Sequence, residues 1–118
     1  MASPSKVHGN LYAGTPVFPT YIDEMVLGAD TQETYTVPAG MNWAIIVNVS
    51  SGTVWARSGA AASVPAAEVA DGTGSFPLPP NTSYQCQVAP GGTLSFIRTA
   101  GTAATVSIAL WTVRPSGS

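Results

Sequence analysis

The sequence predicts an all-β protein, an antiparallel β-sandwich of about eight strands with an extended N-terminal arm. Three features predict it: the spread of glycine and proline, the alternation of apolar and polar residues, and the abundance of Val and Thr. The 118 residues include 12 Gly and 10 Pro, and the longest stretches free of both are 41–51 and 102–114. Globular helices average about 11–12 residues, so only these two stretches could hold an ordinary helix. Both instead show the period of two that is typical of a half-buried strand.

The stretch 41–50 is predicted to be a strand whose apolar face points into the core. Trp43, Ile45, Val47 and Val49 fall on one side of it. We therefore expect Trp43 to be a core residue.

The stretch 105–113 is predicted to be a second long strand with the cleaner alternation. Val106, Ile108 and Leu110 share one face, and small or hydroxyl residues occupy most of the other. Trp111 falls on the side opposite Val106, Ile108 and Leu110, so it is expected to point outward, where a protein interface or a carbohydrate platform could use it.

The remaining strands are separated by turn signals at intervals of about ten residues. The eight predicted strands lie near 25–27, 33–37, 43–49, 53–57, 75–78, 83–88, 94–99 and 105–113. Residues 50–52 read as a tight hairpin turn. The turn segments Pro38-Ala-Gly40, Pro79-Pro-Asn81 and Pro90-Gly-Gly92 end strands. Eight strands without helices must bury their apolar faces against one another, which indicates a sandwich, with a jelly roll favoured, or a small barrel.

The chain divides by composition into an arm at 1–22, a sandwich domain at 23–113 and a mobile tail at 114–118. The arm is apolar but has no regular period, and an exposed segment of that kind should pack on something. Its own domain and a neighbouring subunit are both open as the surface it covers. The candidate interface residues are those of the arm together with one outward tryptophan: Val7, Leu11, Tyr12, Val17, Phe18, Tyr21, Ile22 and Trp111.

The charge content is low: four Lys and Arg against six Asp and Glu, a net charge of −2. Nucleic acids and anionic membranes need clustered positive charge, so neither is expected as a partner. A surface this poor in charge is instead expected to meet another protein. The start of the chain shows no apolar signal-peptide region, which indicates synthesis in the cytoplasm.

The residues available for catalysis are few. His8 is the only histidine and Cys86 the only cysteine, so a zinc cluster or a histidine-based triad is not expected. The carboxylates of 23–24, 30–33 and 68–71 lie beside turns or strand ends, where solvated acids are ordinary. Cys86 alternates with apolar residues and is expected to pack as a small hydrophobe whose pKa does not fall. We therefore expect no cofactor, no metal and no enzymatic activity.

Three segments resemble small structural proteins of tailed bacteriophages. They are Tyr35-Thr-Val-Pro-Ala-Gly-Met-Asn-Trp-Ala-Ile-Ile-Val47, Val64-Pro-Ala-Ala-Glu-Val-Ala-Asp-Gly-Thr-Gly-Ser75 and Ala100-Gly-Thr-Ala-Ala-Thr-Val-Ser-Ile-Ala-Leu-Trp111. The likeness spans about 33–111 and is nearest to the jelly-roll cement, or decoration, proteins of the capsid exterior.

This resemblance implies a non-enzymatic virion protein on the outside of the capsid. It would bridge and stabilise neighbouring copies of the major capsid protein and would associate with itself as a dimer or trimer. Two alternatives remain: a carbohydrate- or receptor-binding module of a tail fibre that uses Trp55 or Trp111, and a head–tail or tail component.

Overall fold

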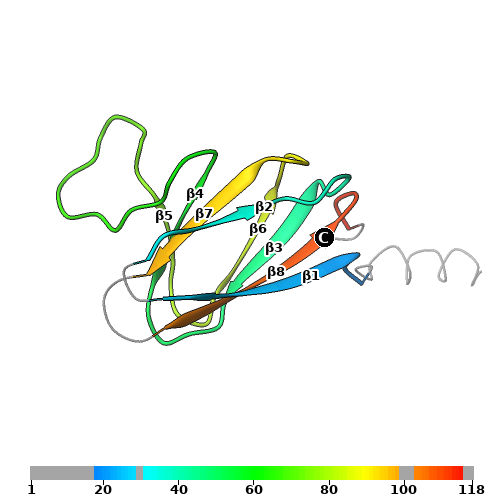
Figure 1. The fold of residues 1–118 in the computed structure, drawn as a ribbon, viewed down its shortest axis with the longest axis horizontal. Helices are drawn as coiled ribbons and strands as arrows, with labels where there is room; N and C mark the ends of the chain where they lie inside the picture. The colour runs from blue at the N-terminus through cyan, green and yellow to red at the C-terminus, as the bar shows by residue number, and fades with distance from the viewer. Residues whose placement is uncertain (1–17, 29–30, 99–102, 116–118) are drawn as a thin grey trace, which may run out of the picture.

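The computed structural model describes residues 18–28, 31–98 and 103–115, and within them it contains eight strands and no helix. The strands are β1 Tyr21–Leu27, β2 Glu33–Thr36, β3 Trp43–Asn48, β4 Val54–Ser58, β5 Phe76–Leu78, β6 Ser83–Gln87, β7 Thr93–Arg98 and β8 Ala104–Trp111. The predicted all-β fold and all eight predicted strands are confirmed (Figure 1). No helix in these described ranges could cross a bilayer.

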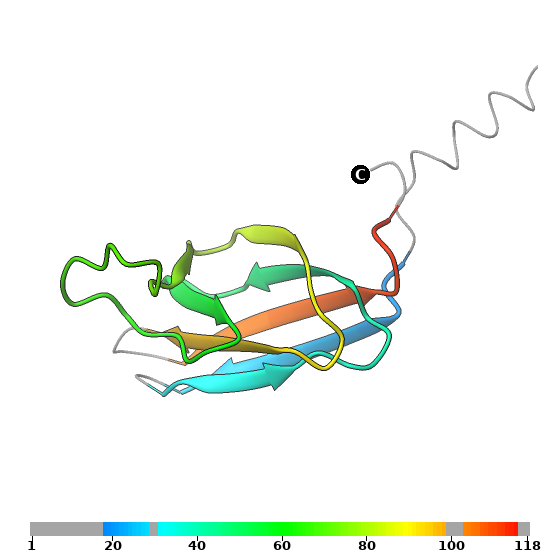
Figure 2. The ribbon, with the colours of Figure 1, turned by 90° about the horizontal axis from the view of Figure 1, so that it is seen from above.

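The strands form two four-stranded antiparallel sheets that pack as a β-sandwich (Figures 1 and 2). One sheet has the order β1-β8-β3-β6 and the other the order β2-β7-β4-β5. The pairing is nested, because β4 pairs with β5, β3 with β6, β2 with β7 and β1 with β8. The start of β1 therefore lies beside the end of β8, and β5 and β6 form two neighbouring sheet edges.

The core lies between the sheets and is lined by alternate residues of each strand. In β8 the predicted inward side chains, Val106, Ile108 and Leu110, are fully buried, as the sequence predicted. The largest fully buried side chains are Phe96, Leu27, Ile108, Leu110, Val37, Val54, Val106 and Asn48. The described arrangement needs no disulfide, since Cys86 is free.

The predicted orientation of β3 is wrong. Its buried side chains are Ala44, Ile46 and Asn48, whereas Trp43, Ile45 and Val47 are half-buried on the opposite side. The alternation misled because both faces of this strand are apolar, and pairing of Ile46 with Ile108 sets the inward side. A polar residue, Asn48, completes the inward face.

Asn48 ties the two sheets together at one end of the sandwich. Its Nδ2 donates to the carbonyl oxygens of Gly52 at 2.7 Å and Leu78 at 2.8 Å, and more weakly to that of Pro79 at 3.3 Å. Its Oδ1 accepts from the backbone N–H and the hydroxyl of Ser50. A buried amide is stable only when its hydrogen bonds are made, and here both ends of the group are satisfied.

The predicted domain boundaries shift at both ends of the sandwich. Tyr21 and Ile22, assigned to the arm, belong to β1 and pair with Leu110 and Ala109 of β8. Arg114 and Pro115, assigned to a mobile tail, are also placed: the Arg114 guanidinium lies 5.0 Å from the centre of the Trp43 ring, and Pro115 is buried. Residues 1–17 and 116–118 lie outside the described part.

The predicted turns are confirmed where they required a left-handed backbone. Gly40, Asn81 and Gly91 have φ values of 81°, 56° and 78°, a conformation that glycine and asparagine adopt most readily. These turns place the strand ends that surround the sites described next.

Candidate functional site

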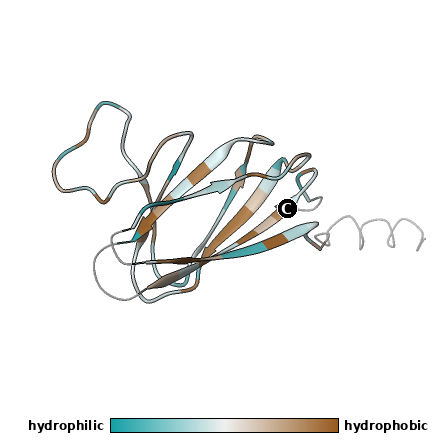
Figure 3. Cartoon of the chain, in the orientation of Figure 1, coloured by the Kyte–Doolittle hydropathy of each residue, from teal (hydrophilic) through white to brown (hydrophobic). Residues whose placement is uncertain are grey.

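The outer face of the β1-β8-β3-β6 sheet is the first candidate, and we call it the outer face. Residues that pair directly across strands share a side of the sheet, so the register defines its members. They are Ile22, Glu24, Val26, Thr105, Ser107, Ala109, Trp111, Trp43, Ile45, Val47, Ser83, Gln85 and Gln87. Glu24 is the only charged residue in this set, and β3 is hydrophobic over most of its length (Figure 3).

The β1 margin of the outer face exposes large apolar side chains to solvent. Val26 is 65% exposed and Ile22 is 50% exposed, and Phe18, just before the strand, is 78% exposed. Apolar groups clustered on a surface mark sites of protein contact more often than isolated ones do. The predicted interface residues Phe18, Tyr21 and Ile22 are therefore exposed, although Tyr21 lies on the side of β1 opposite Ile22.

The remaining predicted interface residues have different outcomes. Val7, Leu11, Tyr12 and Val17 lie outside the described residues. Trp111 lies on the outer side of β8, as expected, but it is only 6% exposed, so the expectation that it is an available surface side chain is wrong. Its register partner is Trp43, and the chain after β8 turns back across this pair, as the Arg114–Trp43 contact shows.

A hollow of about 390 Å³ lies where the C-terminal segment returns to the sheet. It is lined by Asn42, Trp43, Gln87, Thr112, Val113 and Arg114. The Asn42 Nδ2 donates to the Thr112 carbonyl oxygen at 2.8 Å, which holds the segment in place. The hollow therefore joins an indole, two carboxamides and a guanidinium.

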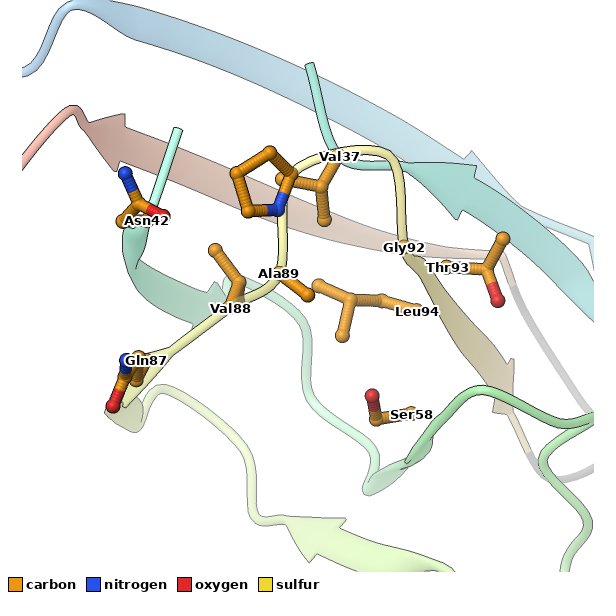
Figure 4. Close-up of a pocket in the computed structure, with 10 residues that line it drawn as sticks. Val37, Asn42, Ser58, Gln87, Val88, Ala89, Gly92, Thr93 and Leu94 are labelled. Atoms are coloured by element: carbon orange, nitrogen blue, oxygen red, sulfur yellow. The ribbon is translucent and has the colours of Figure 1, made fainter. Parts of the chain in front are cut away.

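A groove opens between the sheets on the side where β5 and β6 are edge strands. It consists of two adjoining hollows of about 540 and 260 Å³, which share Ser58, Gln87 and Leu94. Figure 4 shows the larger hollow, to which Val37, Val88 and Leu94 contribute apolar side chains. The smaller hollow is lined mainly by core residues and by Cys86, and is flanked by Phe76 and Tyr84, whose ring centres lie 4.6 Å apart. We call the two hollows together the inter-sheet groove.

The opposite side of the sandwich is closed by a polar contact. The Tyr35 hydroxyl of β2 donates a hydrogen bond to Asp23 Oδ2 of β1 and so joins the two sheets. Burial, and then this hydrogen bond, raise the pKa of the Tyr35 hydroxyl well above its usual value. Tyr35 is therefore held in its neutral, donating form.

The acidic residues singled out in the sequence lie, where the structure describes them, in β1, β2 and the 59–75 loop. Asp23 and Glu24 point to opposite faces of β1. Glu68 and Asp71 are exposed in the 59–75 loop, where the hydrogen bonds from Thr73 lower the pKa of Asp71. Among the described residues no group of three or more His, Cys, Asp or Glu side chains could hold a metal ion. His8 and Asp30 lie outside those residues.

Cys86 takes the position that its strand predicted. Cys86 packs against the edge of the core opposite Ala44, and burial raises the pKa of its thiol, so it shows no activation as a nucleophile. Arg98 is buried, and its Nη1 donates to the Ala103 carbonyl oxygen at 2.7 Å.

Sequence reasoning missed both the outer face and the inter-sheet groove. The outer face did leave a signal, because residues 43–47 are apolar in both parities, a pattern of strands covered on both sides. The groove left none, since its lining residues come from separated segments between 37 and 96.

Comparison with known proteins supports the fold and no function. No family model and no curated protein sequence matches the chain. Its structure is similar to that of a de novo designed double-stranded β-helix, with a TM-score of 0.53 and 13% sequence identity, over 77% of this chain and 99% of the designed one.

Proposed function

We propose that this protein is a non-enzymatic structural protein of a virion, a capsid decoration protein whose outer face docks on the major capsid protein. The observation that carries the docking surface is the apolar character of β3 on both sides. Ala44 and Ile46 fill the core, while Trp43, Ile45 and Val47 form an equally apolar surface on the other side. A strand apolar on both sides is typical of sheets that are covered on both sides.

The identity of the partner is inferred from the resemblance of the sequence to phage cement proteins. A protein that binds the joint between two capsid subunits stabilises the assembled shell, because it binds the joined arrangement and not the separated one. If one copy contacts two neighbouring subunits, the first contact holds the second site at a high effective concentration, so the overall affinity exceeds that of either contact alone. The low charge and the exposed Phe18, Ile22 and Val26 suit such a contact.

We also propose that the sandwich is a jelly roll, the finer form that the sequence predicted. The nested order of the strands and the likeness to a designed double-stranded β-helix support it. Jelly rolls are a frequent fold of capsid proteins, but the fold alone does not imply the function.

The test is binding to capsids of the phage whose genome carries the sequence. Val26→Lys places a charge at the most exposed apolar position within β1, near the end of the β1 margin. Val69→Lys is the matched control, since Val69 is 50% exposed but lies in the 59–75 loop of the other sheet. An unpaired charge buried in an interface is costly, so Val26→Lys should bind at least about tenfold more weakly, and Val69→Lys should bind normally.

Two results would contradict the proposal. Equal capsid binding by both variants would remove the outer face from the contact. No binding of the unchanged protein to capsids, at protein concentrations up to about 100 μM, would remove the capsid as the partner, because specific and stable protein–protein contacts bind far more tightly.

A second candidate is a glycan-binding module, and the hollow beside Trp43 favours it. An indole flanked by the amides of Asn42 and Gln87 is a suitable arrangement for a sugar ring. Arg114 lies over the Trp43 ring, so a stacked sugar would have to displace it. A glycan array probed with the protein and with Trp43→Ala separates this function from the first: hits that require Trp43 would favour it.

A further inference from the structure

The inter-sheet groove is a surface feature of the described chain that the proposed function does not use. Its walls are core residues, including Ile46, Leu94 and Phe96, and its rim carries Phe76 and Tyr84, which are 50% and 42% exposed. The groove runs along β6, an edge strand that pairs with β3 on one side only. An apolar channel beside an unpaired strand edge is suited to an extended peptide with apolar side chains.

We infer that the occupant of the inter-sheet groove is the first part of the same chain, residues 7–17. This segment carries Val7, Leu11, Tyr12 and Val17. It contains no Asp, Glu, Lys or Arg, and Lys6 lies just before it. Its Gly9, Gly14 and Pro16 disfavour a helix. Its apolar composition and its low helix propensity therefore match the groove.

The described part of the chain begins at the end of the sandwich where the groove opens. The Thr20 N–H donates to the Leu110 carbonyl oxygen, and the N–H of Asn42, a groove residue, donates to the adjacent Trp111 carbonyl oxygen. The N–H of Val88, also a groove residue, donates to the Asn42 carbonyl oxygen. These bonds form a continuous row from the start of β1 to the mouth of the groove.

The distance is short enough for the segment to reach the groove of its own molecule. β1 and β6 are separated by three strand spacings, which is roughly 14 Å. The seven Cα–Cα steps from Leu11 to Phe18 can span about 23–25 Å when extended. A tethered segment has an effective concentration of about millimolar, so its own groove is filled before that of a second copy.

Cys86 gives a direct readout, because it is the only cysteine and lines the groove. The experiment measures the rate at which iodoacetamide alkylates Cys86 in the native, full-length chain. Leu11→Asp combined with Tyr12→Asp removes the two adjacent apolar anchors. Ser3→Asp combined with Ser5→Asp is the matched control, since it adds the same charge shortly before the segment and leaves the anchors in place.

We expect the Leu11→Asp/Tyr12→Asp protein to react about tenfold faster than the unchanged chain, and the control to react at the unchanged rate. A urea unfolding midpoint measured on each protein shows whether the sandwich itself is intact. Equal rates for all three proteins, with intact sandwiches, would overturn the inference. Slow alkylation that becomes fast when the unchanged chain is diluted from about 100 to 1 μM would also overturn it, because the segment would then come from a second copy. The result does not depend on capsid binding, so it stands or fails separately from the proposed function.

Discussion

The outer sides of the two sheets differ in how the chain itself covers them. On the β2-β7-β4-β5 sheet, the 59–75 loop crosses β7: the Ala62 N–H donates to Ser95 Oγ at 2.8 Å, and Gln32 Nε2 donates to the same oxygen at 2.6 Å. Ser95 is only 3% exposed as a result. On the other sheet, the described chain covers only the Trp43–Trp111 end, through Arg114.

The difference in cover decides which face is available to a partner. The part of the β2-β7-β4-β5 sheet that the 59–75 loop covers at Ser95, which we call the closed face, offers little to another molecule. An apolar face that is left open exposes surface whose burial yields about 25 cal/mol per Å². The comparison predicts that substitutions on the closed face cost stability, whereas substitutions on the open face cost binding.

The largest expected effect is at Asn48, which joins both sheets. Asn48→Ala removes an amide that satisfies two or three carbonyl oxygens and two donors of Ser50. Each buried polar group left without a partner costs about 1–3 kcal/mol, so we expect a loss of about 3–5 kcal/mol in the free energy of unfolding. Urea denaturation measures it, and a loss below about 1 kcal/mol would show that the sheets are not joined through this residue.

Ser95→Ala and Ser107→Ala test the comparison directly. Ser95 lies in β7 under the loop, and Ser107 occupies the open face in β8, where no hydrogen bond of its hydroxyl is seen within the described residues. We expect Ser95→Ala to cost about 1–2 kcal/mol and Ser107→Ala less than about 0.5 kcal/mol. Faster proteolysis of the 59–75 loop in Ser95→Ala alone would show that the hydroxyl anchors it. Equal unfolding free energies of Ser95→Ala and Ser107→Ala would show that the 59–75 loop does not stabilise the sheet that it covers.

The strand pattern was predictable from the sequence because turns are local. Gly40, Asn81 and Gly91 stand where the chain needs a left-handed backbone, and these residues divide the sequence into the observed strands. In β8 the clean alternation also predicted the inward side, since only one parity is apolar.

The direction of β3 and the burial of Trp111 were not predictable in the same way. Both parities of 43–47 are apolar, so only pairing with β8 decides which side faces the core. Trp111 lies on the outer side, as its parity indicated, but a segment that returns after β8 covers that end. The inter-sheet groove depends on how two sheets meet, which no local pattern contains.

Tyr35 tests the closed side of the sandwich through pH. Its folded-state pKa is raised above the unfolded value of about 10. The unfolded chain therefore loses this proton first, so the stability that it contributes is fully present below about pH 10 and falls as the pH rises above it. Tyr35→Phe should show a shallower fall in unfolding free energy above pH 10 than the unchanged protein. If the unfolding free energies of the two proteins fell in parallel above pH 10, neither burial nor the hydrogen bond to Asp23 would retain the Tyr35 proton in the folded state.

The smallest expected effect concerns Arg114, which caps the open face at its Trp43 end. A guanidinium over an indole at a partly exposed site contributes about 0.5–1 kcal/mol, so Arg114→Ala should lower the unfolding free energy by no more than that. The same variant should increase quenching of tryptophan fluorescence by acrylamide, because the Trp43 ring loses its cover. Arg114→Lys is the control that keeps the charge. Its unfolding free energy and its acrylamide quenching should lie between those of Arg114→Ala and those of the unchanged protein. Unchanged quenching in Arg114→Ala would mean that the C-terminal segment does not shield this end, and the open face would then extend across the whole sheet.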